Sequence, residues 1–493
     1  MKDMLMGSIA MMAVVSLASC SANSDFDNTN TTDLNTKESV QSPVEFGTYL
    51  AQSKNTRAGE TATAPASDAP EMTTETLKKT GFGVIAFYTE SSKYQESTTS
   101  VEPNFMYNTK VSGDGWTYSP IKYWPNGGQN QGSTSDDGAQ YVSFFAYAPY
   151  KAVAASTGTA DDKATSGITA LSSNAVSGDP TVSYTLGATG ADADLLWGTA
   201  GTNGVTTSDG AQNGTTFTNA KAAVNANLSK MKVGGKVQFN FKHALAKFGG
   251  TGAGTDNKTS GLMVVADIDN VPPTTGGTLD ADTKITVKSI KIESVIKGSD
   301  ENMTKEASIP TSGTLNLATG VWTTTGTNGK IDYEINSPKA TATVTAPKGA
   351  TVQTLNEAIA EPTGDNIPWE NLPKGVTTTP QSVYTETTPL LIIPDGNDHV
   401  FRITIDYIVR TKDEALSKKY TEVEQSFYKD LTLKTVSLNA KYNLLIHLGL
   451  TSVKFEANVS NWENTANGGA TDGSSTDTDP MVIYMPANVA SAK

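Results

Sequence analysis

Long stretches of this chain alternate between apolar and polar residues, and this period of two is typical of a β-strand with one buried face. The longest run places on one face Phe401, Ile403, Ile405, Tyr407 and Val409, and on the other Arg402, Thr404, Asp406 and Arg410. A second run alternates in the same way through Val237, Phe239, Phe241 and His243. Such runs recur from residue 82 to residue 462, whereas helical periodicity is confined to short pieces. The pattern predicts an all-β protein built from sandwiches.

Composition and length set the scale of this fold. The 493 residues include 43 Gly and 21 Pro, which favour turns and long loops between strands. A chain of this length contains about two to four domains. A glycine-containing break at residues 230–236 predicts two domains, residues 58–232 and 233–462.

Several local features give sharper expectations. The apolar parity changes near Ser289, which predicts a β-bulge. The sequence from Asp395 to Asp398 is turn chemistry between two apolar runs and predicts a hairpin. Residues 116–124 are expected to form a strand, and residues 151–180 a surface loop. Because Phe401 and Ile403 belong to the predicted core, truncating either to Ala should cost about 2–5 kcal/mol.

Charge and cysteine content exclude several classes of protein. The formal net charge is −14, and only Arg57, Arg402 and Arg410 are arginines, so nucleic acid is not an expected partner. Cys20 is the single cysteine, which excludes an internal disulfide and a cysteine-held zinc or iron–sulfur site.

The N-terminus has the features of an export signal. Residues 4–18 are apolar or small, follow Lys2, and end in Leu17-Ala18-Ser19-Cys20. This segment is short for a membrane span and has the length of a secretory signal. Small residues before a cysteine are typical of a bacterial lipobox, so residues 1–19 are expected to be a lipoprotein signal peptide and Cys20 the lipidated residue. A plain secretory signal is the alternative.

Two short strands are expected outside the main domains. Residues 43–50 alternate, with Val44, Phe46 and Leu50 on one face, and a linker containing Arg57 follows. Near the other end, residues 463–480 form a Gly/Asn/Thr/Asp tether, and a strand-like apolar run occupies residues 481–489. The run can pair within its own chain or with another molecule.

No catalytic or cofactor-binding pattern stands out. The histidines His243, His399 and His447 lack metal-ligand spacing, and His243 is expected to be a satisfied core or rim residue. There is no nucleophile elbow and no P-loop. We therefore expect a protein that is not an enzyme and needs no cofactor.

The chain resembles the fimbrillin family of Bacteroidetes, lipoprotein pilins of type V pili that include the Mfa-like group. The resemblance rests on pieces that occur in the expected order between residues 17 and 462. They are the lipobox, Thr56-Arg57-Ala58, Phe82-Gly83-Val84-Ile85-Ala86-Phe87, Trp116-Thr117-Tyr118-Ser119-Pro120, Val142-Ser143-Phe144-Phe145-Ala146-Tyr147, Phe241-Lys242-His243-Ala244-Leu245, Tyr442-Asn443-Leu444 and Phe455-Glu456-Ala457-Asn458-Val459-Ser460-Asn461-Trp462.

The resemblance implies two tandem transthyretin-like β-sandwich domains with long loops and a C-terminal strand-like tail. It also implies a life cycle. The protein is exported to the outer membrane as a surface-exposed lipoprotein, with residues 20–57 as a lipidated propeptide. An Arg-specific protease cuts between Arg57 and Ala58. The first strand is then displaced by a donor strand of another fimbrillin subunit, which in this chain corresponds to Val482, Ile483, Tyr484 and Met485 within residues 463–493.

Other functions stay open on sequence alone. The chain could be an outer-membrane glycan-binding lipoprotein that does not polymerise, using exposed aromatic side chains. A secreted hydrolase is less favoured because the motifs are missing. As a fimbrial subunit it would support adhesion, with a host or bacterial surface ligand as a further partner.

Overall fold

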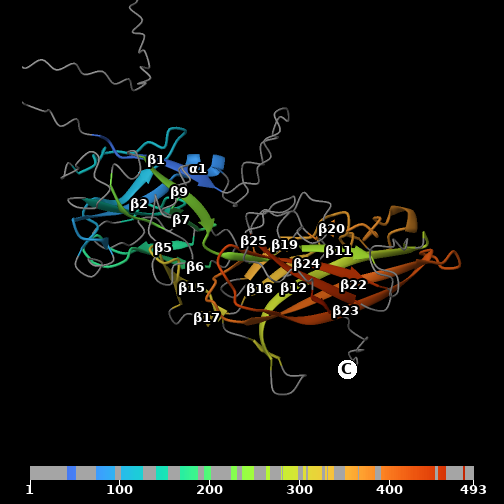
Figure 1. Ribbon diagram of the computed structural model, residues 1–493. Helices are drawn as coiled ribbons and strands as arrows, with labels where there is room; N and C mark the ends of the chain where they lie inside the picture. Colours follow the sequence, from blue (N-terminus) through green and yellow to red (C-terminus); the bar gives the residue numbers. More distant parts are fainter. Residues whose placement is uncertain are drawn as a thin grey trace, which may run out of the picture. The chain divides into compact units, whose positions relative to one another are not determined.

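The computed structural model describes residues 42–50, 74–94, 101–125, 140–153, 167–186, 194–200, 224–229, 236–248, 262–266, 279, 281–297, 304–306, 309–324, 328–329, 331–337, 350–364, 366–383, 390–449, 453–461 and 481–483. All of them belong to one compact unit, Gln41–Lys493. Nearly every element is a strand, so the predicted all-β class is confirmed. The strands form several sheets that stack on apolar faces, as in β-sandwiches (Figure 1).

The first sheet holds seven strands, all but β9 from residues before the predicted boundary (Figure 1). Its order is β1, β9, β7, β4, β2 and β3, with β8 paired to β4. The bounds are β1 (Glu45–Leu50), β2 (Phe82–Glu90), β3 (Met106–Val111), β4 (Tyr141–Ala148), β7 (Leu196–Ala200), β8 (Asn225–Leu228) and β9 (Lys236–His243). Both faces of this sheet are buried. On β4, Phe144 and Ala146 belong to one apolar cluster, and Phe145 and Tyr147 belong to the other.

A short helix, α1 (Thr74–Thr80), lies against the first of these clusters through the buried Leu77. Glu75 in its first turn and two lysines in its last turn complement the helix dipole. Gly81 ends it with a φ of 76°, a conformation that favours glycine, and its N–H donates to the Leu77 carbonyl at 2.8 Å. The sequence did not predict this helix.

A four-stranded sheet joins residues from both sides of the predicted boundary. It contains β5 (Ile168–Leu171), β6 (Thr181–Thr185), β15 (Ser312–Asn316) and β16 (Trp322–Thr323), in the order β16, β15, β6 and β5. Two tryptophan side chains also form hydrogen bonds between distant parts of the sequence. Trp197 Nε1 donates to the Leu317 carbonyl and Trp322 Nε1 donates to the Ala244 carbonyl, both at 2.8 Å. Residues 230–235 lie outside the described part, and the boundary stays a prediction. The strand β5 lies inside the stretch expected to be a loop, so that part of the loop prediction is wrong.

The remaining residues build two larger sheets. One has the order β20, β11, β24, β10 and β21, extended from β24 by β25 and then β26. The other has the order β19, β18, β12, β22 and β23, with β13 on β12. The bounds are β10 (Ala246–Phe248), β11 (Leu262–Ala266), β12 (Thr283–Lys297), β13 (Thr304–Glu306), β18 (Asp332–Asn336), β19 (Ala350–Thr354), β20 (Gln381–Ser382), β21 (Leu390–Ile392), β22 (His399–Lys412), β23 (Tyr420–Leu433), β24 (Ala440–Leu448), β25 (Val453–Asn461) and β26 (Met481–Ile483). Two short strands, β14 (Ile309–Pro310) and β17 (Asn328–Gly329), pair separately, and η2 (Trp369–Asn371) is a single 3₁₀ turn.

The predicted bulge is confirmed, because the pairing of β12 with β22 shifts register between Val287 and Ser289. The predicted hairpin is wrong. β21 pairs with β10, while β22 pairs with β12 and β23, so the turn from Asp395 to Asp398 connects two different sheets. An Asx-type contact, in which the Asn397 N–H donates to Asp395 Oδ1 at 2.9 Å, reverses the chain without pairing its two arms.

The core prediction is confirmed, since Phe401, Ile403 and Ile405 are fully buried. We expect Ile403→Ala to lower the free energy of unfolding by about 2–5 kcal/mol and Ile403→Val by about 0.5–1.5 kcal/mol, because the larger truncation leaves the larger cavity. Urea unfolding of the two variants measures both. Equal losses for the two variants would contradict a close-packed site.

Candidate functional site

The first strand, β1, occupies the edge of the seven-stranded sheet and pairs with β9 in parallel (Figure 1). The register joins six residue pairs, among them Phe46 with Val237 and Thr48 with Phe239. The strand thus extends a sheet whose other members lie far away in the sequence. The position that β1 occupies beside β9 is called the groove below. It is the natural candidate for a site that exchanges strands.

Residues just before β1 are held by a second segment, 118–124. The Val44 N–H donates to the Lys122 carbonyl at 2.8 Å, and the Trp124 N–H donates to the Ser42 carbonyl at 3.0 Å. The Tyr118 hydroxyl donates to the Val44 carbonyl at 2.8 Å. Burial raises the pKa of Tyr118, although a contact with the Lys122 backbone opposes the shift, so the phenol keeps the proton that it donates.

The segment 118–124 was expected to belong to a strand over residues 116–124, and this prediction is wrong. Residues 116–124 take part in isolated bridges, Ser112 with Thr117 and Pro43 with Tyr123, instead of a continuous ladder. Trp116 has a φ of 48° and Pro120 has no N–H to donate, and both features break an extended ladder.

Phe46 in β1 and Val44 just before it fill the groove, as the alternation predicted. Val44 is 1% exposed and Phe46 is 3% exposed, and both belong to the same buried cluster. The Phe46 ring lies among four other aromatic rings, with centroid distances of 5.2 Å to Tyr118, 5.9 Å to Phe144, 6.2 Å to Phe239 and 6.4 Å to Phe82. Leu50 lies in β1, but its side chain is outside the described part.

Thr48 in β1 is an exception to this apolar packing. The Thr48 hydroxyl is buried and has no hydrogen-bond partner among the residues that the structure describes. A buried polar group without a partner costs about 1–3 kcal/mol. Sequence reasoning selected Val44, Phe46 and Leu50 and overlooked Thr48, although its even number places it on the same face.

The C-terminal run is placed beside its own chain. β26 pairs antiparallel with β25 through three residue pairs, of which Ile483 with Phe455 and Val482 with Glu456 are two. Tyr484 and Met485 lie outside the described residues, as do Cys20, Arg57 and Ala58. The described structure therefore brings Val44 and Phe46 together with the groove, but it does not bring the candidate donor residues to that groove.

Sequence reasoning missed the walls of the groove. Phe82, Phe144 and Phe239 come from three different strands, and Tyr118 comes from the irregular segment. Their even spacing within each strand signals a buried face, but nothing local says that these faces meet around Phe46.

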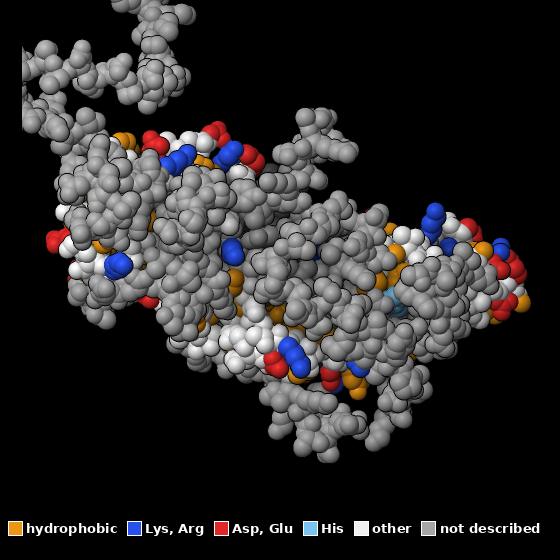
Figure 2. All heavy atoms as spheres, viewed as in Figure 1, with side chains coloured by type: hydrophobic (Ala, Val, Ile, Leu, Met, Phe, Trp, Pro, Cys, Tyr) orange, Lys and Arg blue, Asp and Glu red, His pale blue; other side chains and the backbone are white. Residues whose placement is uncertain are grey.

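The described residues contain no group of three or more His, Cys, Asp or Glu side chains suited to a metal ion. His243 is instead buried beside Asp194, with its Nδ1 atom 2.8 Å from a carboxylate oxygen, as expected of a satisfied core histidine. In the part of the chain that the structure describes, no helix has the length and hydropathy needed to cross a bilayer. On the face that Figure 2 shows, described basic and acidic side chains stand in small mixed groups without a broad basic patch.

Comparison with known proteins adds a fold relative. No family model matches the chain, and no curated protein matches it. A fimbrial protein from Bacteroides vulgatus is similar in structure, with a TM-score of 0.51, 18% sequence identity, and coverage of 85% of this chain and 99% of that one. A candidate cell adhesion protein from Bacteroides uniformis gives a TM-score of 0.34 at 15% identity over 78% of this chain and 94% of that one. One from Bacteroides ovatus gives 0.32 at 13% over 86% and 98%.

At identities of 13–18% the likeness concerns the fold alone, and of these three structures the one from Bacteroides vulgatus has a TM-score above 0.5. That structure is matched over nearly its whole length, so the arrangement of strands is shared across the chain and not in one sheet only. The chain therefore has the fold of a Bacteroides fimbrial protein, as its resemblance to the fimbrillins predicted.

Proposed function

We propose that this chain is a structural subunit of a cell-surface fimbria, exported as a lipoprotein, cut after Arg57 and polymerised by donor-strand exchange, and that the fimbria supports adhesion. The observation that carries the proposal is β1. It is a short edge strand near the N-terminus. Phe46 in this strand and Val44 just before it fill an aromatic groove of a sheet built from distant parts of the chain.

The position of Arg57 supports the same proposal. It follows the last residue of β1 by seven positions and is the only arginine among the first 401 residues. A cut there would leave β1 without a covalent link to the sheet that it completes. Another subunit could then add its own strand to the vacated edge, which is recognition by β-strand addition.

Such a joint is head-to-tail and need not close, so it can grow into a filament. The partners in this proposal are other fimbrillin subunits, an Arg-specific protease, and the outer membrane through the lipid on Cys20 before processing. The protein would be exposed at the cell surface and then reside in the fimbrium.

The N-terminus of the protein recovered from cells tests the processing. We expect it to begin at Ala58 in fimbriae, and we expect the precursor to carry fatty acid on Cys20. Cys20→Ala should abolish incorporation of labelled fatty acid, because the chain has no other cysteine. Labelled fatty acid in the Cys20→Ala protein, or fimbriae whose subunits still begin at Cys20, would contradict the proposal.

A further inference from the structure

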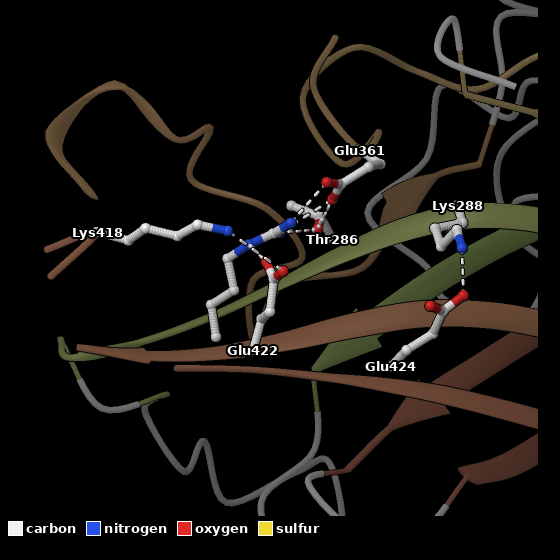
Figure 3. Close-up of polar contacts among 7 residues, drawn as sticks. Thr286, Lys288, Glu361, Lys418, Glu422 and Glu424 are labelled. Carbon is white, nitrogen blue, oxygen red and sulfur yellow. Dashed lines mark hydrogen bonds and ion pairs between the residues drawn. The ribbon is translucent and has the colours of Figure 1, made fainter. Parts of the chain in front are cut away.

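A polar cleft of about 400 Å³ opens on the outer face of the sheet formed by β12, β22 and β23, far in sequence from the β1 groove. Its size falls within the range of small-molecule sites. Charged side chains line it (Figure 3), and these are Lys288, Glu361, Arg410, Lys418, Glu422 and Glu424.

The floor of the cleft is a buried ion pair. Arg410 Nη2 donates to Glu361 Oε1 at 2.6 Å and Nη1 donates to Glu361 Oε2 at 2.9 Å, and the two side chains are 4% and 6% exposed. The Thr286 hydroxyl donates to the same carboxylate at 2.5 Å. Burial opposes the charge on Arg410, but these contacts outweigh it and raise the pKa of the guanidinium.

Described residues between 361 and 376 form one wall of the cleft, and backbone hydrogen bonds to β12 anchor both ends of this segment. The Glu361 N–H donates to the Val287 carbonyl at 2.8 Å, at the bulge of β12, and the Val376 N–H donates to the Ile285 carbonyl at 2.7 Å. Between these anchors, Lys284 Nζ donates to the carbonyls of residues 369 and 372 at 2.9 and 3.0 Å. The cleft is therefore held open by the fold before any ligand arrives.

The rim is more exposed, and its charges alternate (Figure 3). Lys288 contacts Glu424, and Glu422 lies between Arg410 Nε at 3.3 Å and Lys418 Nζ at 3.9 Å. Among the residues that the structure describes, three basic and three acidic side chains line the cleft, so the formal charges of these six cancel. Ile367, Leu372 and Tyr420 also line the cleft.

This balance selects the chemistry of the ligand. Three carboxylates would repel an anion, and three basic groups would repel a cation. Each of these basic groups already contacts one of the carboxylates. A neutral polyol gains from both kinds of group, because its hydroxyls donate to carboxylates and accept from ammonium groups. Sugar rings also carry C–H faces that suit an apolar wall. We propose that this cleft binds a neutral saccharide of about one or two rings.

The proposal goes beyond polymerisation, and the uncut monomer tests it. Saturation-transfer NMR on the purified chain should detect at least one neutral sugar among glucose, galactose, mannose, fucose, N-acetylglucosamine, lactose and maltose. N-acetylneuraminic acid and glucosamine serve as anionic and cationic comparators. Glu422→Gln should weaken the binding of that sugar about tenfold or more, because a charge-assisted acceptor is lost at the rim.

Glu414→Gln is the matched control, because Glu414 is an exposed glutamate paired with Lys412 at 2.8 Å and does not line the cleft. The affinity of the Glu414→Gln variant for the detected sugar should equal that of the unaltered chain. No signal from any neutral sugar, stronger binding of either charged comparator, or equal affinity of Glu422→Gln and Glu414→Gln would each overturn the proposal. Because no cut at Arg57 is involved, these outcomes are independent of strand exchange.

Discussion

Cutting the purified precursor after Arg57 is expected to turn a monomer into a ladder of head-to-tail oligomers. Before the cut, β1 is tethered to its sheet, and the tether gives it a high effective concentration at the groove. After the cut, only its own contacts hold it. Burial of Val44 and Phe46 contributes about 1.5–3 kcal/mol each to the free energy that holds the strand in the sheet. The six residue pairs between β1 and β9 add backbone hydrogen bonds. Light scattering after size-exclusion chromatography follows the oligomers.

The candidate donor strand, β26, should be released from its own sheet more easily than β1 is released from the groove. β26 holds its own sheet through three residue pairs, against six for β1. Val482 and Ile483 point to opposite faces of a strand, so a donor would place one of them on the side that Phe46 occupied and rebury apolar surface there.

Residues 21–57 include five acidic and three basic residues, so their loss changes the net charge by only +2. Processing therefore acts through the groove more than through electrostatics.

Controls separate the cut from the donor. Arg57→Ala should stay monomeric under the same protease, because the strand remains tethered. A chain truncated after Asp479 should be cut but should not polymerise, because it lacks the donor. If the truncated protein polymerises as well as the full chain, residues 480–493 are not the donor.

A matched pair of variants tests the groove itself. Phe46→Ala should speed oligomer growth after the cut, since the strand loses its contacts with four aromatic rings. Thr48→Val should slow growth, since it removes a buried hydroxyl that has no described partner. Identical rates for the two variants would mean that release of β1 does not limit assembly.

Arg410→Met is expected to cost about 3–5 kcal/mol of unfolding free energy, because it leaves the Glu361 carboxylate buried without its partner. The more accessible pair of Arg402 with Asp430, whose side chains are 18% and 27% exposed and whose charged atoms lie 2.7 Å apart, offers the comparison. Arg402→Met should cost about 0–1 kcal/mol, although both arginines lie on β22.

Urea unfolding at neutral pH measures both variants. The double variant Arg410→Met/Glu361→Leu should recover most of the loss, because no buried charge is then left alone. A loss from Arg410→Met no larger than that from Arg402→Met would show that the floor of the cleft is open to water.

The sequence by itself determined the buried faces of the long alternating strands. The alternation through Phe401, Ile403 and Ile405 predicted the core face of β22, and the parity change near Ser289 predicted the bulge of β12. Both are local properties, because neighbouring side chains of a strand point to opposite faces whatever the strand pairs with. For the same reason Val44 and Phe46 could be assigned to a buried face before the groove was seen.

Only the tertiary structure decided which strands meet. The turn at Asp395 reads as a hairpin in sequence, yet its two arms enter different sheets, because backbone hydrogen bonding is the same for every candidate partner strand. Arg402 and Arg410 share one polar face in sequence, but the loop anchored at Val287 covers Arg410 and buries it with Glu361. The groove around Phe46 likewise needs three strands and the segment at Tyr118 to converge. Periodicity records which side of a strand is buried, while the identity of what buries it is set by contacts between residues far apart in the chain.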